Sequence, residues 1–299
     1  MFTRSRCTAA AALAVAALIT SAAQAQQTVY AIAGGGSTLI RFQSNNPSNV
    51  TVVGNFGGDA TFLDALDFRP ATGELFGYLD STDSFYRVNL ATGVLSQATV
   101  GSPTAPTNTF QLGLDFNPVL DRARIVTDSA QNIVFNPLTG TAASFTNLAY
   151  ALGDANANAS PNIIDNAYSQ SFAGSLATTQ YAIDYGTGSL VTLANNAGTL
   201  TTVGSLGVST GIYTGFDIFT GSGNVDVGYA ILTAPGGSPS FYTINLASGQ
   251  ATLVGAIGTV GGAVDNQVYS LAVIPAPATM MLFAFGIAAA GVRRRRCAS

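Results

Sequence analysis

The feature that most constrains the fold of this chain is a unit of about 45 residues that recurs along it. Clear copies occupy residues 65–101, 113–145 and 215–255. Each copy contains four short apolar runs, separated by turns rich in Gly, Asn, Pro and Ser, which indicates β-strands and not helices. Four-stranded repeats of this length are typical of β-propeller blades, which pack radially and protect their sheet edges.

The strands are expected in the same order in every copy. The first strand ends in Leu-Asp-Phe or Phe-Asp-Ile, and a turn such as Asn-Leu-Ala-Thr-Gly precedes the fourth strand. In that turn the Asn and Thr side chains cap backbone groups, and the Gly supplies the positive φ of a short hairpin. The second and third strands of the three copies are expected at residues 75–79 and 85–89, 123–127 and 133–136, and 227–233 and 241–245.

Two weaker copies complete the set. Residues 166–204 form one, after a long Asn- and Ala-rich loop at 147–165, and residues 29–54 form the other, which lacks a first strand. Residues 267–274 resemble the first strand of the last copy, so the missing strand lies at the far end of the domain. A solenoid or a sandwich has no use for such a displaced strand, whereas a propeller uses it to close its ring. We therefore predict an all-β domain over residues 26–274, a β-propeller of about five four-stranded blades closed by the C-terminal strand.

The N-terminus has the pattern of a secretory signal peptide. Arg4 and Arg6 precede an apolar run at 9–19, and Ala23-Gln24-Ala25 forms a small-residue cleavage site. Residues 1–25 are therefore expected to be removed after Ala25.

The C-terminal tail, residues 275–299, combines a Pro275-Ala276-Pro277 motif with an apolar run at 278–292. Four arginines follow it: Arg293, Arg294, Arg295 and Arg296. A helix over the apolar run spans roughly 23 Å, slightly short of a bilayer core, and the arginines favour the cytoplasmic side. A plain membrane anchor is one interpretation. The same layout resembles the PEP-CTERM sorting signal of Gram-negative bacteria, although Ala276 stands where that signal has Glu. The resemblance implies an exosortase-type processing enzyme as a partner, an inner-membrane-anchored precursor, and release to the cell surface or exterior.

Composition excludes several function classes. Both cysteines lie in the two end segments, so residues 26–274 can form no disulfide. This range also contains no His, the commonest general base, and neither Lys nor Cys, two common nucleophiles. Five arginines stand against 15 acidic residues in this range, a formal charge of −10 that disfavours nucleic acid. We expect a non-enzymatic protein. The alternative is a carboxylate-based polysaccharide hydrolase or lyase on the propeller scaffold.

Asp67, Asp115 and Asp217 occupy the same position in the first strand of three copies. First strands lie nearest a propeller axis, where several carboxylates can hold Ca²⁺. The alternative is structural, with each carboxylate accepting backbone N–H bonds or pairing with an arginine. The fourth copy and the closing strand are expected to lack this Asp, with Ala272 near the equivalent position. No other cofactor is expected.

The basic residues expected beside these carboxylates are Arg69, Arg122 and Arg124. The cluster Asp121-Arg122-Ala123-Arg124 allows two interpretations, an acidic-sugar site in which Arg forks hold a carboxylate, or salt links that fix a blade. Other acidic residues fall in loops between second and third strands and are expected in solvent: Asp80, Asp83 and Asp128.

Several segments resemble a bacterial family known as a domain of unknown function, number four-three-nine-four of its series. They are ALDFRPATGELFG, GLDFNPVLDRARIV, NAYSQSFAG, LTTVGSLGV and FYTINLASGQATLVG. The resemblance spans residues 28–258 and implies a propeller-like exported protein, with no known catalytic or binding residues to transfer. The exosortase-type tail implies an extracellular role linked to exopolysaccharide and biofilm, with extracellular polysaccharide or surface proteins as partners.

Overall fold

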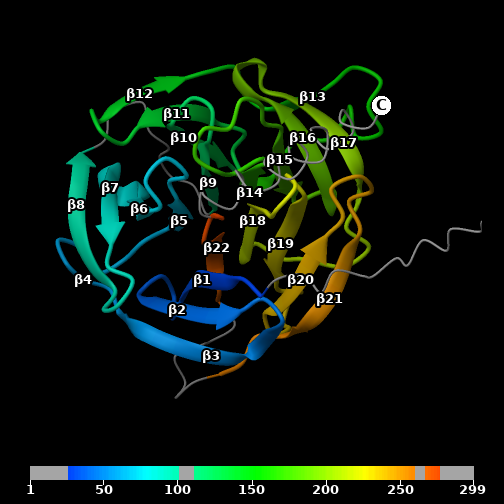
Figure 1. Cartoon of the computed structure of the whole chain (residues 1–299). Helices are drawn as coiled ribbons and strands as arrows, with labels where there is room; N and C mark the ends of the chain where they lie inside the picture. The colour runs from blue at the N-terminus through cyan, green and yellow to red at the C-terminus, as the bar shows by residue number, and fades with distance from the viewer. Residues whose placement is uncertain (1–25, 101–110, 260–266, 277–299) are drawn as a thin grey trace, which may run out of the picture.

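The protein is a five-bladed β-propeller, seen in a computed structural model that describes residues 26–100, 111–259 and 267–276 (Figure 1). Five separate, mainly antiparallel sheets surround a common axis. The expected signal peptide at 1–25, the apolar run at 278–292 and the arginines at 293–296 lie outside the described residues. Within the described ranges, no helix has the length and apolar character needed to span a membrane.

Each blade has four antiparallel strands, ordered from the axis outward. Blade I contains β22 (Tyr269–Val273), β1 (Thr28–Ala33), β2 (Thr38–Gln43) and β3 (Asn46–Asn55). Blade II contains β5 (Ala65–Phe68), β6 (Leu75–Leu79), β7 (Ser84–Val88) and β8 (Val94–Val100). Blade III contains β9 (Leu112–Asn117), β10 (Arg122–Thr127), β11 (Asn132–Asn136) and β12 (Thr141–Ser144). Blade IV contains β14 (Ile163–Tyr168), β15 (Gln180–Asp184), β16 (Ser189–Ala194) and β17 (Thr199–Ser205). Blade V contains β18 (Thr214–Thr220), β19 (Asp226–Leu232), β20 (Ser240–Ile244) and β21 (Ala251–Ala256).

Short elements decorate two of the blades. β4 (Gly57–Gly58) and β13 (Ala149–Tyr150) add parallel to the outer strands β8 and β17. Two 3₁₀ turns, η1 (Asp80–Thr82) and η2 (Asn195–Ala197), connect the second and third strands of blade II and the third and fourth strands of blade IV.

The ring closes as the displaced strand predicts. β22, from the C-terminal part of the domain, pairs antiparallel with β1 and completes blade I (Figure 1). The five inner strands contact one another in succession around the axis, in the order β5, β9, β14, β18, β22 and back to β5.

Apolar side chains fill the spaces between neighbouring blades. Between blades II and III, Phe85 and Phe135 lie with ring centroids 4.6 Å apart, and Phe76 lies 5.5 Å from Phe116. Because both faces of each sheet are covered, the inner strands are almost wholly buried, which explains their continuous apolar runs. These inter-blade cores stabilise the domain without disulfides.

The repeated turn has the predicted geometry. In blade II the Asn89 side chain accepts the Ala91 N–H at 2.9 Å, and Gly93, with φ of 75°, donates its N–H to the Asn89 carbonyl at 2.8 Å. Gly249 does the same for Asn245 in blade V. The Asn and Gly of this motif are therefore fixed by backbone geometry.

One element departs from the sequence prediction. β14 (Ile163–Tyr168) begins inside the segment 147–165 that was expected to be a loop. Its sequence lacks the Leu-Asp-Phe signature, and its pairing with β15 shifts register between Ile163 and Asp165. Ala167 occupies the position that Asp217 has in blade V, and the polar residue of this strand, Asp165, lies two residues earlier, which is why the repeat does not reveal this strand.

Candidate functional site

Three carboxylates meet at the axis, as their equivalent positions predict. One oxygen each of Asp67, Asp115 and Asp217 lies within 4.8 Å of the other two, and the side chains come from blades II, III and V. The three residues are only 4 %, 1 % and 4 % exposed.

Backbone amides of the next blade hold these carboxylates. The Phe116 N–H donates to Oδ2 of Asp67 at 2.8 Å, and the Val273 N–H donates to Oδ2 of Asp217 at 2.6 Å. Each aspartate thus ties its own inner strand to the inner strand that follows it around the ring.

A fourth buried carboxylate joins them. Asp165 of β14 is 1 % exposed, and its oxygens accept the N–H groups of Phe216 at 2.7 Å and Asn166 at 2.9 Å. The expectation that the fourth blade contributes no such Asp was therefore wrong, because Asp165 was assigned to the loop before the strand.

The pairing of the first and second strands shows where the polar residue of each blade lies. Asp217 lies opposite the tyrosine of a Tyr-Ala-Ile segment in the second strand of its blade, and Ala167 and Ala272 lie opposite the corresponding tyrosines in blades IV and I. In those two blades the polar side chain sits two residues earlier, as Asp165 and Ser270. The prediction that Ala272 occupies the equivalent position is confirmed.

Ser270 closes this polar ring. Its hydroxyl accepts the Leu66 N–H and donates to the Leu66 carbonyl, both at 3.1 Å. Blades I and II are therefore joined by a neutral side chain, whereas carboxylates make the corresponding contacts between blades II and III, IV and V, and V and I.

The axial carboxylates have no basic partner. Across the ranges that the structure describes, the ion pairs are Arg69–Asp121 and Arg87–Glu74, so the expected pairing of the axial aspartates with arginines was wrong. Desolvation, followed by repulsion from neighbouring aspartates, raises the pKa of Asp115 well above its usual range. Oδ1 of Asp115 is buried without a hydrogen-bond partner.

The pKa values of the other axial carboxylates are raised as well. Burial raises the pKa of Asp67 and of Asp165 well above the usual range, and it raises the pKa of Asp217 to about 6. The amides that hold each group oppose this shift only in part. The axis therefore concentrates acidic groups whose negative charge is unfavourable there.

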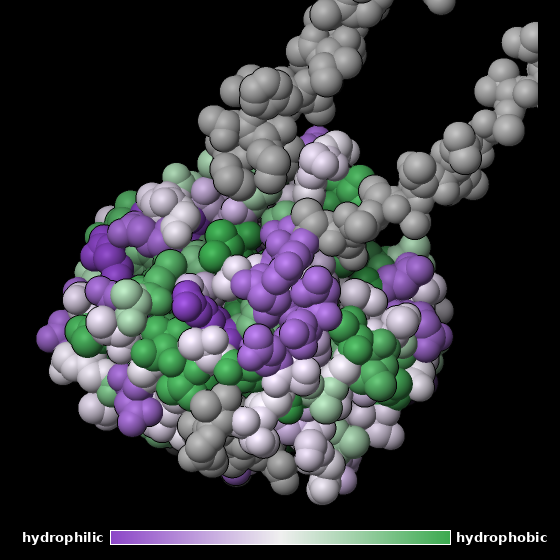
Figure 2. All heavy atoms as spheres, turned by 60° about the horizontal axis from the view of Figure 1, so that its bottom comes forward, coloured by the Kyte–Doolittle hydropathy of each residue, from purple (hydrophilic) through white to green (hydrophobic). Residues whose placement is uncertain are grey.

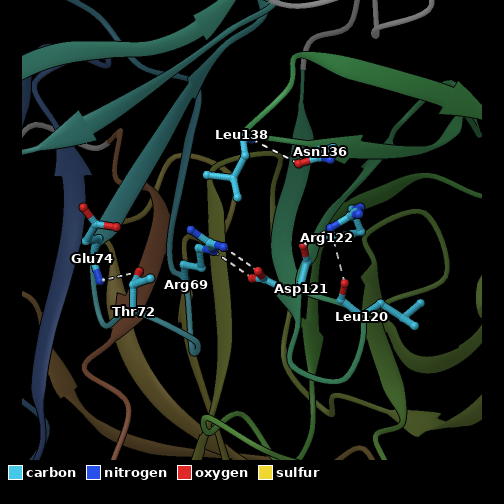
Figure 3. Close-up of polar contacts among 8 residues, drawn as sticks. All are labelled: Arg69, Thr72, Glu74, Leu120, Asp121, Arg122, Asn136 and Leu138. Carbon is cyan, nitrogen blue, oxygen red and sulfur yellow. Dashed lines mark hydrogen bonds and ion pairs between the residues drawn. The ribbon is translucent and has the colours of Figure 1, made fainter.

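Arg69 instead pairs with Asp121 across blades II and III (Figure 3). Its Nε donates to Oδ1 of Asp121 at 2.7 Å and its second nitrogen, Nη2, donates to Oδ2. This pairing lowers the pKa of Asp121. Arg122 donates to the carbonyls of Asp121 at 2.8 Å and Leu120 at 3.5 Å (Figure 3), so it does not extend the ion pair.

Arg124 is buried among neutral groups between blades III and IV. It is 2 % exposed and donates to the hydroxyl of Tyr168 at 3.2 Å and to Oδ1 of Asn132 and Asn196 at 2.5 and 2.8 Å. Its guanidinium carbon also lies 5.7 Å from the centre of the Phe145 ring.

A pocket of about 200 Å³ opens beside this arginine. Its polar and aromatic lining comes from both blades: Asn117, Arg122, Arg124, Phe145, Tyr168 and Asn196. Arg122 and Arg124 bring two positive charges to its wall, and no carboxylate side chain is part of the lining. The pocket therefore has the chemistry of an anion site.

A second depression is acidic. Asp64 and Asp80 line a cleft of about 530 Å³ in blade II, where Oδ2 of Asp64 accepts the Asp80 N–H at 2.7 Å. Desolvation, and then repulsion by Asp64 and Asp83, raises the pKa of Asp80 to about 7. Asp80 was expected to be solvated, yet its Oδ1 is buried without a hydrogen-bond partner, and Asp83 accepts a bond from the Tyr78 hydroxyl at 3.1 Å.

One face of the domain mixes polar and apolar residues. On the face shown in Figure 2, hydrophilic residues gather near the middle and separate apolar areas lie beside them. Such mixing is ordinary for a domain surface exposed to water.

The fold and its axial polar ring define the class of this protein as a five-bladed β-propeller. The family described as "Domain of unknown function (DUF4394)" matches residues 12–272, and the chain belongs to it. A PEP-CTERM protein-sorting motif matches residues 273–296, which implies exosortase-dependent sorting to the cell surface or extracellular space. Both resemblances noted in the sequence are thus confirmed. A search of curated proteins gives no significant match.

Solved structures give only distant likenesses. Hydrazine synthase of Kuenenia stuttgartiensis matches with 13 % identity and a TM-score of 0.40, over 65 % of this chain and 49 % of that one, so the chain spans about half its length. A chain of a nidogen/laminin complex matches with 8 % identity and a TM-score of 0.47, over 83 % and 98 % of the two chains. A Bacteroides thetaiotaomicron protein of unknown function matches with 13 % identity and a TM-score of 0.48, over 84 % and 65 %. These scores carry no functional argument.

Proposed function

We propose that the mature chain is a non-enzymatic propeller of the extracellular matrix that binds acidic polysaccharide. In this proposal an inner-membrane-anchored precursor is processed by an exosortase-type enzyme, and the released domain holds uronate-type carboxylates in the Arg124 pocket. The observation that carries the proposal is a buried arginine, open to a pocket, that forms no ion pair within the described residues.

The donors of Arg124 suit a carboxylate. A guanidinium has five N–H donors, and Arg124 donates three hydrogen bonds to neutral oxygens, so it retains donors and a positive charge for a ligand. Arg122 adds a second positive charge on the pocket wall.

The size and surroundings of the pocket limit what enters. About 200 Å³ admits a carboxylate and part of one sugar ring, and excludes a bulky ligand. Because the rest of the domain is strongly acidic, a polyanion is held at this site and repelled elsewhere. Binding is therefore expected to be local, one sugar acid at a time along a chain.

Calorimetric titration of the chain lacking its signal peptide, held in mild detergent, tests this function. A polyuronate should bind, and the matched neutral polysaccharide should not. Arg124→Gln and the milder Arg122→Gln should each weaken binding about 10- to 100-fold, the range for a charge-assisted hydrogen bond. Arg87→Gln is the matched control, because Arg87 is exposed and paired with Glu74 outside the pocket. Equal binding by all variants, or no binding by the unaltered chain, would contradict the proposal.

A second candidate is the carboxylate-based polysaccharide hydrolase or lyase. It is favoured by Asp64 and Asp80, two neighbouring carboxyl groups in a cleft of about 530 Å³, with a pKa of about 7 for Asp80. A protonated carboxyl beside a second one is the arrangement of an acid and a base in glycoside cleavage. The assay measures release of reducing or unsaturated sugar ends. Release that is lost in Asp80→Asn but kept in Asp128→Asn would establish this function. Absence of products over a panel of acidic and neutral polysaccharides would dismiss it.

A further inference from the structure

The axis of the propeller holds a compact set of oxygen atoms from three different blades. One carboxylate oxygen each of Asp67, Asp115 and Asp217 lies within 4.8 Å of the other two. When a calcium ion is bound at 2.3–2.6 Å, oxygens on opposite sides of it lie about 5 Å apart, so the separation fits ligands of one ion.

The carboxylates are held rigidly by backbone groups. The Phe116 N–H fixes Asp67, and the N–H groups of Val273 and Ile218 fix the two oxygens of Asp217 at 2.6 and 2.5 Å. The ring of inner strands therefore presents the oxygens without the entropic cost of ordering loose side chains.

A second observation at Asp115 points to a bound ligand. It is 1 % exposed, and its Oδ1 has no hydrogen-bond donor although it is fully buried. Buried polar oxygens in folded proteins are almost always satisfied, and a solitary one calls for a water or an ion. Arg124 lies opposite Asp115 in the β-ladder but donates to Tyr168 and to asparagines instead.

The charge balance points the same way. Asp165 adds a fourth buried carboxyl to these three, and in the described parts of the chain none of the four belongs to an ion pair. Buried charges are stable when they are paired or when they coordinate a metal ion.

We propose that Asp67, Asp115 and Asp217 bind one Ca²⁺ ion on the propeller axis. The donors are hard oxygens, which Ca²⁺ prefers, and the protein has no His and no Cys between residues 26 and 274 that would select a transition metal. The ion joins the inner strands of blades II, III and V. Asp115 lies opposite Arg124 in the β-ladder, but the proposed ion site does not depend on the function of the Arg124 pocket.

The test measures thermal unfolding and calcium binding of the chain lacking its signal peptide, in mild detergent. After dialysis against a chelator, Ca²⁺ at about 100 times its dissociation constant should raise the melting temperature by about 5–10 °C, and calorimetry should give one ion per chain. Mg²⁺ should do less, because it requires a tighter octahedral shell.

Two ligand variants and one control variant keep the outcome interpretable. Asp115→Asn retains the side-chain shape and should abolish both the calcium heat and the calcium-dependent shift, and Asp67→Asn should do the same if the first variant fails to fold. Asp184→Asn is the matched control: Asp184 is also fully buried but binds Tyr150 and Thr187 away from the three ligands, so the calcium shift should persist. Identical melting with Ca²⁺ and with chelator, or a calcium shift that survives in Asp115→Asn, would overturn the proposal.

Discussion

Replacing Gly113 by Ala tests the close approach of neighbouring inner strands. Gly113 lies in β9, and a Cβ atom added there would lie 2.6 Å from the backbone nitrogen of Asn166 and 2.6 Å from the Cα of Asp165. Both atoms belong to the backbone of β14, so no change of side-chain rotamer relieves the overlap. The two inner strands must move apart.

The size of the effect follows from this geometry. Ordinary contact of a Cβ begins at 3.4 Å, so the strands must shift enough to disturb the inter-blade packing. Overpacking of this kind costs about 1–3 kcal/mol. Weakening the hydrogen bond from the Leu114 N–H to the Asp165 carboxylate adds about 1 kcal/mol. Removing a glycine also restricts the unfolded chain, which offsets about 0.4–1 kcal/mol. We therefore expect Gly113→Ala to lower the free energy of unfolding by about 2–3 kcal/mol.

Equilibrium unfolding in urea, followed by tyrosine fluorescence and circular dichroism, measures this loss. Gly57→Ala is the matched control, because Gly57 also lies in a strand and a Cβ there meets no atom within 4 Å. The control should change the free energy of unfolding by less than about 1 kcal/mol. If Gly113→Ala unfolds at the same urea concentration as the control, the inner strands do not pack as described.

Three further predictions concern single polar contacts. Ser270→Ala should lower the free energy of unfolding by about 1–3 kcal/mol in urea titrations, because a buried amide and carbonyl of β5 lose their partner, and an unchanged value would contradict the polar ring. Arg69→Ala should destabilise the protein at pH 7 and destabilise it less at pH 2–3. The pKa of Asp121 is lower in the folded protein than its unfolded value of 3.8, so the ion pair stabilises the fold above pH 3.8 and this stabilisation is lost as the pH falls. Melting curves that show the same loss at both pH values would refute that pairing. Asp80→Asn should have a higher melting temperature than the unaltered protein at pH 8 and nearly the same one at pH 4. Folding raises the pKa of Asp80 from 3.8 to about 7, so the unaltered protein keeps its full stability below pH 3.8 and loses part of it as the pH rises through 7. An equal difference in melting temperature at both pH values would argue against the buried carboxyl.

The sequence predicts the fold well because its repeat carries both strand order and register. The Leu-Asp-Phe and Phe-Asp-Ile segments place Asp67, Asp115 and Asp217 at one position, and a ring of blades turns equal positions into proximity. The displaced strand at the C-terminus likewise allows only a closed ring, which β22 forms with β1.

The missed features all depend on contacts between blades or loops. Asp165 escapes the repeat because its strand has Ala167 at the repeated position and carries the aspartate two residues earlier. Arg124 faces Asp115 within its own blade, yet its bonds to Tyr168 and Asn196 come from the next blade, which no pattern along the sequence encodes. The same holds for Asp80, whose burial depends on how its loop folds.

The most direct test of the proposed function follows the protein in the bacterium that produces it. Cultures are separated into cells, extracellular matrix and free medium, and the protein is quantified in each fraction with an antibody. We expect the unaltered protein and Arg87→Gln to be retained in the matrix. Arg122→Gln and Arg124→Gln, when folded and exported equally well, should appear mainly in the free medium. A protein found mainly in the medium without any substitution, or pocket variants retained as firmly as the control, would contradict binding of matrix polysaccharide through the Arg124 pocket.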